Sequence, residues 1–408
     1  MDFMTTPYDV AIVGAGPAGS AAAISLARGG WRVLLVDRTT FPRDKPCAEY
    51  LSPAAEPLLR ELGVLDTIVN TGPGRPRGFR IYTPNGGMFQ GDFAGTCDAT
   101  GRPFFETGLA VPRYTLDAIL VEGARRAGAS VSENWTLGSI ERDSGGIWTL
   151  TTRSGAPVRA RILIAADGIH STVARRLGLF KRGRLRKVAL VAHLRGVAGM
   201  DGYGEMHVAG RRYVGLALLE AGGDLCNAAM VVDAVRDDHR LAGRAEAFLL
   251  ETLETFPGLR GRLAEARVVR RTLTASGLHT RARRLSGDGL LLIGDAAGYY
   301  DPFTGEGIYR GLRSAQLAAD VAADALAAGD AGAARLARYD TLYRRAFRGT
   351  VQVERLIQAA VQTPWLMNHA GGRLARRTGM ADTLMAITGD FLPAAAMLNP
   401  AFLLRLLI

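Results

Sequence analysis

The hydrophobic pattern at the start of the chain predicts a strand, a helix and a second strand. Residues Tyr8–Val13 form a short, almost continuous apolar run, which is typical of a strand buried in a parallel sheet. A glycine-rich turn follows, and the alanine-rich segment 20–30 has the composition of a helix. A second apolar run, residues 32–36, ends at Asp37. This order indicates the opening βαβ unit of an α/β sheet.

Two later segments have the same strand–turn–helix order. Residues 161–165 form a predicted strand, and a turn at Asp167 and Gly168 precedes a short helix. Residues 290–293 form another predicted strand, which ends at a Gly-Asp pair, and a long amphipathic helix begins near residue 305.

The region between these two segments has no βαβ rhythm. Residues 187–197, 211–220, 225–233 and 266–275 read as strands joined by turns, which predicts an antiparallel sheet. Its apolar positions favour a lipophilic or largely uncharged ligand. From about Ala334 the pattern becomes helical, with apolar residues at spacings of three and four.

Composition excludes several classes of protein. The net charge is +11, carried almost entirely by arginine, but no nucleic-acid-binding motif accompanies it, and a codon preference for arginine is the favoured explanation. Cys47, Cys97 and Cys226 are widely separated, without the spacing of a metal site or a disulfide scaffold. We therefore expect no bound metal, no nucleic-acid partner and a reducing, cytoplasmic environment.

The two ends of the chain carry weak membrane signals at most. The first residues lack the basic start and apolar run of a signal peptide, and no segment approaches the eighteen apolar residues of a membrane span. Residues 391–408 are apolar apart from Arg405 and Asn399. We expect a terminal helix packed on the core, and keep contact with a bilayer surface as the alternative.

The glycine-rich turn after the first strand matches the requirements of a dinucleotide. In GAGPAG, Gly14 permits a tight turn, Gly16 lets a pyrophosphate approach the backbone, and Gly19 lets the helix pack closely. Asp37, at the end of the second strand, is placed to accept hydrogen bonds from a ribose. The motif alone does not distinguish NAD from FAD.

Four motifs in order identify the type of fold. They are GAGPAG, Arg113 before TLDAIL, ADGIHS, and LIGDAAG with DPFTGEGI. With them the chain resembles the glutathione-reductase-like FAD proteins that include p-hydroxybenzoate hydroxylase and geranylgeranyl reductase. This resemblance implies an α/β fold: a glutathione-reductase-like FAD-binding Rossmann domain (1–70, 100–176, 280–330), an inserted antiparallel-sheet substrate domain (71–99, 177–279) and C-terminal helices as a cap (331–408).

The resemblance also implies roles for individual residues. Asp295 would bind ribityl or ribose hydroxyls, Arg113 would lie near the pyrophosphate, and the helix start at Gly305 would present N–H groups to the flavin N1 and C2=O atoms. The full set expected at the FAD is Gly14, Gly16, Pro17, Ala18, Gly19, Asp37, Arg38, Cys47, Ala48, Arg113, Asp167, Gly168, Gly294, Asp295, Pro302, Gly305, Glu306, Gly307 and Ile308.

Two reactions are the main alternatives for this protein. Residues 45–53, KPCAEYLSP, resemble the KPCGxxLSP stretch of the geranylgeranyl reductases, whereas the histidine and helix motif of the aromatic hydroxylases are missing. Ala48 replaces the glycine, and the strand at 212–217 lacks the tryptophan and proline of the reductases. We expect an FAD-dependent oxidoreductase that reduces a double bond of a hydrophobic molecule (lipid, isoprenoid, quinone or polyketide-like), with an NAD(P)H-dependent monooxygenase as the alternative.

Other functions of the fold are less favoured. The WxWxIP signature and active-site lysine of halogenases have no obvious counterpart, and a noncatalytic prenyl carrier need not keep a flavin site. The sequence contains no second GxGxxG, so we expect either transient NAD(P)H binding or a protein electron donor.

The sequence alone does not decide which residues are catalytic. Cys47 is either a thiol near the flavin or a buried structural one, and Glu49 and Tyr50 are either acids near the substrate or loop residues. His207 is either a proton donor or a satisfied sheet residue. Tyr300, with Tyr299, either stacks on flavin or substrate or packs in the core.

Overall fold

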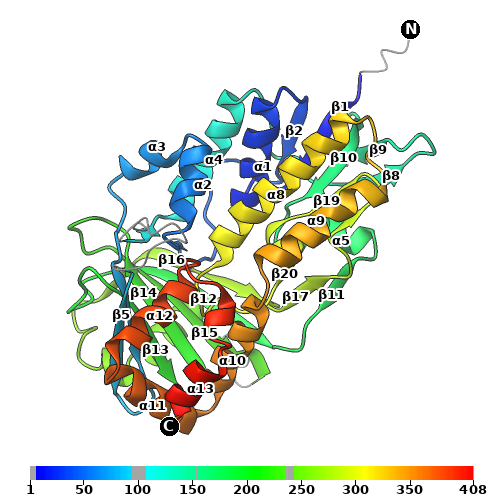
Figure 1. The fold of residues 1–408 in the computed structure, drawn as a ribbon. Coiled ribbons are helices and arrows are strands. Elements are labelled where there is room, and N and C mark those ends of the chain that lie inside the picture. Colours follow the sequence, from blue (N-terminus) through cyan, green and yellow to red (C-terminus); the bar gives the residue numbers. More distant parts are fainter. Residues whose placement is uncertain (1–5, 94–106, 153–154, 236, 238–242, 408) are drawn as a thin grey trace.

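A computed structural model describes residues 6–93, 107–152, 155–235, 237 and 243–407 (Figure 1). Cys97 lies outside these residues. Figure 1 shows two main parts: a sheet flanked by long helices near the N-terminus, and a second large sheet covered by the last helices near the C-terminus.

A largely parallel sheet forms the first part, as the sequence predicts. Its central strands run in the order β19, β10, β1, β2 and β7, all parallel, with β18 antiparallel at one edge and β9 and β8 pairing alongside β10. The bounds are β1 (Tyr8–Val13), β2 (Val33–Val36), β7 (Ser130–Ser132), β8 (Ser139–Arg142), β9 (Trp148–Thr151), β10 (Val158–Ala165), β18 (Ser286–Gly287) and β19 (Leu290–Leu292).

The register of this sheet brings distant motifs together. Val13 pairs with both Val36 and Ala165, and Ala165 pairs with Leu292. The carboxyl ends of four strands therefore share one edge, where ligands of open α/β sheets bind. The segments that follow these strands are the glycine loop, Asp37, the ADGIHS turn and the GDAAG turn.

Helices pack on one face of this sheet, and smaller elements cover the other. The apolar sides of α1, α4 and α8 meet the strands in one large core cluster, while α5 and the strands β8 and β9 cover the second face. The bounds are α1 (Pro17–Arg28), α2 (Ala55–Glu61), α3 (Leu65–Val69), α4 (Arg113–Arg126), α5 (Thr172–Arg176), η2 (Gly294–Ala296), α8 (Gly307–Ala327) and α9 (Ala333–Ala346).

The second sheet has seven strands in the order β16, β12, β15, β14, β13, β4 and β5. It is antiparallel except at one point, where β4 pairs parallel with β13, so the expected antiparallel sheet is mixed. One face packs on α7 (Ala245–Leu253) and η1 (Pro257–Leu259). The strands are β4 (Gly78–Tyr82), β5 (Met88–Asp92), β12 (Lys187–Arg195), β13 (Gly204–Ala209), β14 (Arg212–Leu218), β15 (Cys226–Asp233) and β16 (Arg267–Ser276).

The last helices cover the opposite face of the second sheet, around a cluster that includes Ile81, Phe89 and Met367. They are α10 (Thr350–Gln362), α11 (Pro364–Ala375), α12 (Thr378–Thr388), η3 (Ala394–Ala396) and α13 (Pro400–Leu407). Two small sheets complete the fold: β3 (Tyr50–Leu51) with β6 (Leu109–Ala110), and β11 (Phe180–Arg182), β17 (Thr280–Ala282) and β20 (Gly298–Tyr299). In the described part of the chain, no helix has the length and apolarity needed to cross a bilayer. The predicted domain boundaries stay a prediction.

Candidate active site

The loop between β1 and α1 has two positions that only glycine fits. Gly14 has a φ of +104°, and a Cβ there would lie 2.5 Å from the carbonyl oxygen of Ala166. A Cβ on Gly19 would lie 1.8 Å from the carbonyl oxygen of Gly14, because the first turn of α1 packs directly on the loop. Both contacts are with backbone, which cannot move aside without disturbing the sheet. The two glycines therefore join loop, strand and helix.

Gly16 differs, because the space beside it is open. A Cβ on Gly16 would have no atom of the described residues closer than 3.8 Å, and the nearest are guanidinium nitrogens of Arg113 and Arg43. Helix α1 starts at Pro17, and no described side chain caps it, so its first N–H groups can bind an anion. An open glycine, an uncapped helix start and two guanidinium groups together fit the pyrophosphate of FAD.

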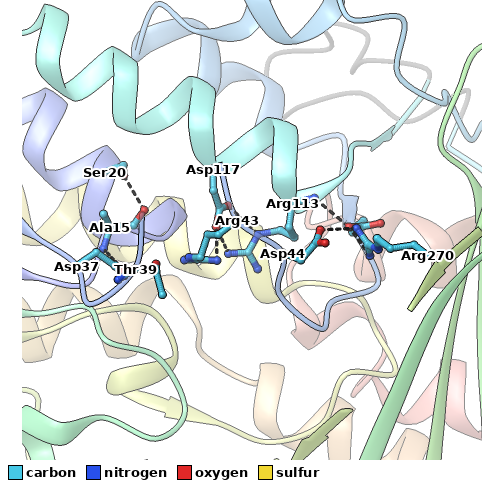
Figure 2. Close-up of polar contacts among 10 residues, drawn as sticks. Ala15, Ser20, Asp37, Thr39, Arg43, Asp44, Arg113, Asp117 and Arg270 are labelled. Atoms are coloured by element: carbon cyan, nitrogen blue, oxygen red, sulfur yellow. Dashed lines mark hydrogen bonds and ion pairs between the residues drawn. The ribbon is translucent and has the colours of Figure 1, made fainter. Parts of the chain in front are cut away.

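Asp117 holds both guanidinium groups in place (Figure 2). Nε and one terminal nitrogen of Arg113 donate to its two carboxylate oxygens, each over 2.7 Å, and Arg43 pairs with it over 3.0 Å. Burial disfavours the charged form of Arg113, but Asp117 raises its pKa above the usual value. Arg113 therefore lies charged beside the loop, where the resemblance places it. Arg43 joins it.

Six residues expected at the FAD do not line the cavity that begins at this loop: Gly14, Gly19 and Glu306, and three expected near the nucleotide. Asp37 accepts a 2.8 Å hydrogen bond from the N–H of Ala15 and so braces the loop (Figure 2). Asp167 accepts a 2.6 Å hydrogen bond from the N–H of Thr172 at the start of α5. Arg38 is exposed. Their contacts with a cofactor stay predictions.

The cavity beside the loop, here called the cofactor cavity, gathers most of the predicted contact residues. It lies between the ends of β1 and β10, the start of α8 and the inner face of the seven-stranded sheet. No described side chain caps the start of α8, so its N–H groups can stabilise negative charge in the cavity. The predicted residues that line it are Gly16, Pro17, Ala18, Cys47, Ala48, Arg113, Gly168, Gly294, Asp295, Pro302, Gly305, Gly307 and Ile308.

The sequence alone did not indicate Lys45 as a site residue, and it indicated Tyr299 only together with Tyr300. Lys45 and Tyr299 both line the cofactor cavity. Burial raises the pKa of Asp295 in this cavity, and the positive charge of Lys45 opposes that shift. The composition could have indicated Lys45, because lysine is rare in this arginine-rich chain. Lys187, another of the few lysines, is buried and forms a 2.6 Å ion pair with Asp301.

A second cavity, here called the apolar cavity, opens from the first. Its volume is about 340 Å³, and β4, β13, β14 and the last helices form its wall. None of the described residues that line it is charged; its polar side chains are Tyr50, Thr304 and Thr388. The residues that line both cavities are Ala48, Tyr50, Met206, Gly215, Pro302 and Gly305.

Tyr50 stands at the junction of the two cavities. Its ring packs against Gly305, where a Cβ would lie 2.8 Å from the ring, and meets Phe79 edge to face at 5.0 Å. Its hydroxyl is buried and has no hydrogen-bond partner among the described residues. Burial and the carboxyl groups of Asp390 and Glu306 raise the pKa of Tyr50 well above its usual value. Of the predicted catalytic candidates, Tyr50 and Cys47 are the two that line a cavity.

Glu49 is neither a substrate-facing acid nor a solvated loop residue, which corrects both expectations. It is fully buried, and its carboxylate contacts His193 over 2.6 Å and accepts 2.7 Å and 2.9 Å hydrogen bonds from Asn227 and the N–H of Arg113. Burial would raise the pKa of Glu49, but His193, the N–H of Arg113 and Arg270 lower it. Its φ of +59° turns its side chain toward them and away from both cavities.

His207 and Tyr300 line neither of the two cavities, and their catalytic roles stay predictions. On β13, Met206 faces the cavities, so His207 faces the other side of the sheet. There its ring stacks on Tyr82 with centroids 4.2 Å apart and contacts Glu205 over 2.8 Å. Tyr300 packs edge to face on a histidine ring outside the cavities.

The family of the chain follows from comparison with known proteins. The model of the family described as FAD binding domain matches residues 7–354. The chain belongs to this family. It is an FAD-dependent oxidoreductase, and the resemblance stated from its motifs is confirmed.

The chain is 30% to 33% identical to three relatives over most of its length, and two of them are named as reductases. Digeranylgeranylglycerophospholipid reductase 1 of Methanothermobacter thermautotrophicus is 33% identical over 84% of this chain and 84% of its own length. Menaquinone reductase of Mycobacterium tuberculosis is 33% identical over 77% of this chain and 76% of its own. Conditioned medium factor receptor 1 of Dictyostelium discoideum is 30% identical over 83% of this chain and 68% of its own.

Solved structures show the same fold at lower identity. A flavoprotein/dehydrogenase from Cytophaga hutchinsonii superposes with a TM-score of 0.82 at 20% identity, covering 97% of this chain and 95% of its own. The flavin-dependent brominase Bmp2 superposes with a TM-score of 0.80 at 21% identity, covering 97% and 98%. These likenesses establish the fold and no particular reaction. The use of NAD(P)H as electron donor stays a prediction.

Proposed function

We propose that this protein reduces carbon–carbon double bonds in a molecule with a long apolar chain, such as a lipid, an isoprenoid or an isoprenoid quinone. The observation that carries the proposal is the apolar cavity, which opens from the cofactor cavity at Tyr50, Met206 and Gly215. Its wall offers an alkyl chain about 25 cal/mol for each Å² removed from water, and offers an ionic group no partner among the described residues.

Two relatives support this substrate class by name. One is named for reducing a digeranylgeranylglycerophospholipid and another for reducing menaquinone, and both molecules carry long isoprenoid chains. The KPCAEYLSP segment adds to this support, because it supplies Ala48 and Tyr50 to the junction where such a chain would meet the cofactor.

When bound and reduced, FAD would supply a hydride to one carbon of the double bond, and an acid would have to supply a proton to the other. The alkene is thereby reduced and the cofactor oxidised. This chain's residues orient the reactants: Gly16 and Arg113 hold the phosphates, and the start of α8 stabilises negative charge. Tyr50 and Met206 place the double bond at the junction. A two-electron donor, which we propose to be NAD(P)H, restores the reduced cofactor.

Anaerobic reoxidation tests the proposal. Protein loaded with FAD and reduced without oxygen is mixed with polyprenyl lipids or menaquinone, and the flavin absorbance and product mass are followed. We expect reoxidation by substrate alone and a product that gains one H₂ for each bond reduced. A reaction that requires oxygen and inserts an oxygen atom would instead establish the monooxygenase. Tight lipid binding without redox change, in protein that fails to retain FAD, would indicate a carrier.

A further inference from the structure

Two buried carboxyl groups lie beside the cofactor cavity and have no role in the proposed function so far. Glu306 and Glu354 are only 4% and 3% exposed. Both line a small third cavity of about 10 Å³, whose wall they share with Asp295, Tyr299 and other residues of the cofactor cavity. One carboxyl oxygen of each has no hydrogen-bond partner among the described residues. A buried oxygen without a partner indicates a carboxyl group that binds or exchanges a proton.

A hydroxyl group connects this pair to the apolar cavity. The side chain of Thr304 is hydrogen-bonded to Glu306 and lines both the small cavity and the apolar cavity. Arg310, one helical turn into α8, forms a 2.9 Å ion pair with Glu354. These four residues therefore lie together around the small cavity, between a buried ion pair and the wall where the substrate chain would lie.

The electrostatics keep a proton on this pair near neutral pH. Burial raises the pKa of Glu306 to about 8, with Arg310 opposing the shift and Glu354 adding to it. Burial likewise raises the pKa of Glu354 to about 7. Besides Arg310, the titratable groups that interact with the pair are Asp301, Asp390, Tyr50, Tyr299, Tyr300 and Tyr309, and Tyr343 is hydrogen-bonded to Arg310.

We propose that Glu306 is the acid that supplies the proton for double-bond reduction, with Thr304 as the link and Glu354 as the group that reprotonates it. This assignment rests on the proposed function. The O–H bond of Glu306 breaks as that of Thr304 re-forms, and the Thr304 proton goes to one alkene carbon while the hydride goes to the other. Tyr50 also lines the junction, but its hydroxyl has no hydrogen-bond partner among the described residues that could return a proton to it.

A spectroscopic experiment tests the proton store without any substrate. Infrared difference spectra of the FAD-loaded protein, recorded between pH 6 and 10, should show a protonated carboxyl band that titrates near pH 8. Glu306→Gln should remove this band, whereas Asp320→Asn, at an exposed carboxyl group on the following helix α8, should keep it. A band that persists unchanged in Glu306→Gln would overturn the assignment, whatever the substrate proves to be.

A kinetic experiment tests delivery of the proton. Anaerobic reoxidation by the alkene should slow as the pH rises above about 8, because Glu306 then loses its proton. Glu306→Gln should be about 100-fold slower, as for loss of a general acid, and should lose this pH dependence. Thr304→Val should be slow, and Thr304→Ser should restore the rate. If no alkene reoxidises the native enzyme, the proposed function fails while the infrared result still stands.

A separate observation concerns the surface formed by the last helices. Trp365, Leu404 and Leu356 are 70%, 57% and 38% exposed, and they come from α11, α13 and α10. The same three helices line the apolar cavity. Figure 1 shows α11 and α13 together at the end of the molecule remote from the N-terminus. We call Leu356, Trp365 and Leu404 the exposed apolar residues of the cap.

The charge around these residues has one sign at the surface. From residue 355 onward the chain carries five arginines, at 355, 373, 376, 377 and 405, and two carboxyl side chains, Asp382 and Asp390. Neither carboxyl group is exposed, and each accepts a hydrogen bond from the protein, over 2.9 Å and 3.0 Å. An aromatic and aliphatic surface among arginines is complementary to an anionic bilayer.

We infer that this surface binds an anionic phospholipid bilayer, from which an apolar substrate enters the cavity behind it. Cosedimentation with vesicles of phosphatidylglycerol should exceed that with phosphatidylcholine and weaken with salt. The double variant Trp365→Ser/Leu404→Ser should reduce binding about tenfold, whereas Val269→Ser, an exposed apolar residue of β16, should not. Equal binding of native protein and double variant, or no vesicle binding, would overturn the inference.

Discussion

At the scale of single residues, the segment 45–50 shows how neighbours in sequence take different tasks. Cys47 and Tyr50 face the cofactor cavity, while Glu49 between them turns away to a buried network with His193 and Asn227. The positive φ of Glu49 makes this reversal possible. From the sequence, Glu49 and Tyr50 form one group because both are polar. Nothing in the local sequence reveals that the backbone reverses at Glu49, or that its partners His193 and Asn227 lie more than a hundred residues away.

The hydrogen-bond network around Glu49 predicts that this residue stabilises the fold and takes no part in the reaction. Glu49→Gln leaves His193 and Arg270 without their carboxylate, so the free energy of unfolding should fall by about 3 kcal/mol at neutral pH. Because folding lowers the pKa of Glu49, its contribution is present above the usual value of 4.5 and is lost as the pH falls through the lower folded value. Urea unfolding from pH 7 to pH 3 checks this. The two curves should converge in acid, whereas the exposed Glu141→Gln should match the native protein throughout.

At the scale of elements, the local sequence pattern was sufficient to predict those parts of the fold whose function depends on consecutive residues. Strand β1, the glycine loop and α1 lie where the apolar run and GAGPAG predict them, because the turn, the helix start and the close packing are all local requirements. The second sheet was harder. Its parallel pair, β4 with β13, joins segments more than a hundred residues apart, and Glu354 on α10 reaches the cavity that Thr304 and Glu306 line only in the folded chain.

The glycine loop gives a prediction that separates binding from folding. Gly16→Val points into open space, so the protein should fold normally but bind FAD at least about tenfold more weakly, about 1.4 kcal/mol. Gly19→Ala points at a backbone oxygen, so the fold itself should lose about 3 kcal/mol. Flavin fluorescence and thermal unfolding of the apoproteins measure the two effects. An equal loss of stability in Gly16→Val and Gly19→Ala would contradict the prediction that Gly16 serves FAD binding and Gly19 serves folding.

At the scale of the whole molecule, one sheet serves two cavities in series. The inner face of the seven-stranded sheet meets the cofactor cavity near β1 and α8, and the apolar cavity under the last helices. The motifs that identified the family lie around the first cavity, whereas the wall of the second comes largely from helices that no motif marks. This is why the cofactor itself could be inferred from sequence, whereas only the apolar class of the substrate could.

The series arrangement predicts that the second cavity can be closed without disturbing the first. Ala360 on α10 lines the apolar cavity and not the cofactor cavity, while its neighbour Ala359 is exposed. Ala360→Trp should fill the cavity, so anaerobic reoxidation by a polyprenyl substrate should slow by about tenfold or more, as substrate binding is lost. Its FAD content and its reduction by dithionite should match those of Ala359→Trp. If a short alkene still reoxidises Ala360→Trp at the native rate while a long one does not, the cavity selects for chain length. Native rates with both would show that the substrate reaches the junction by another route.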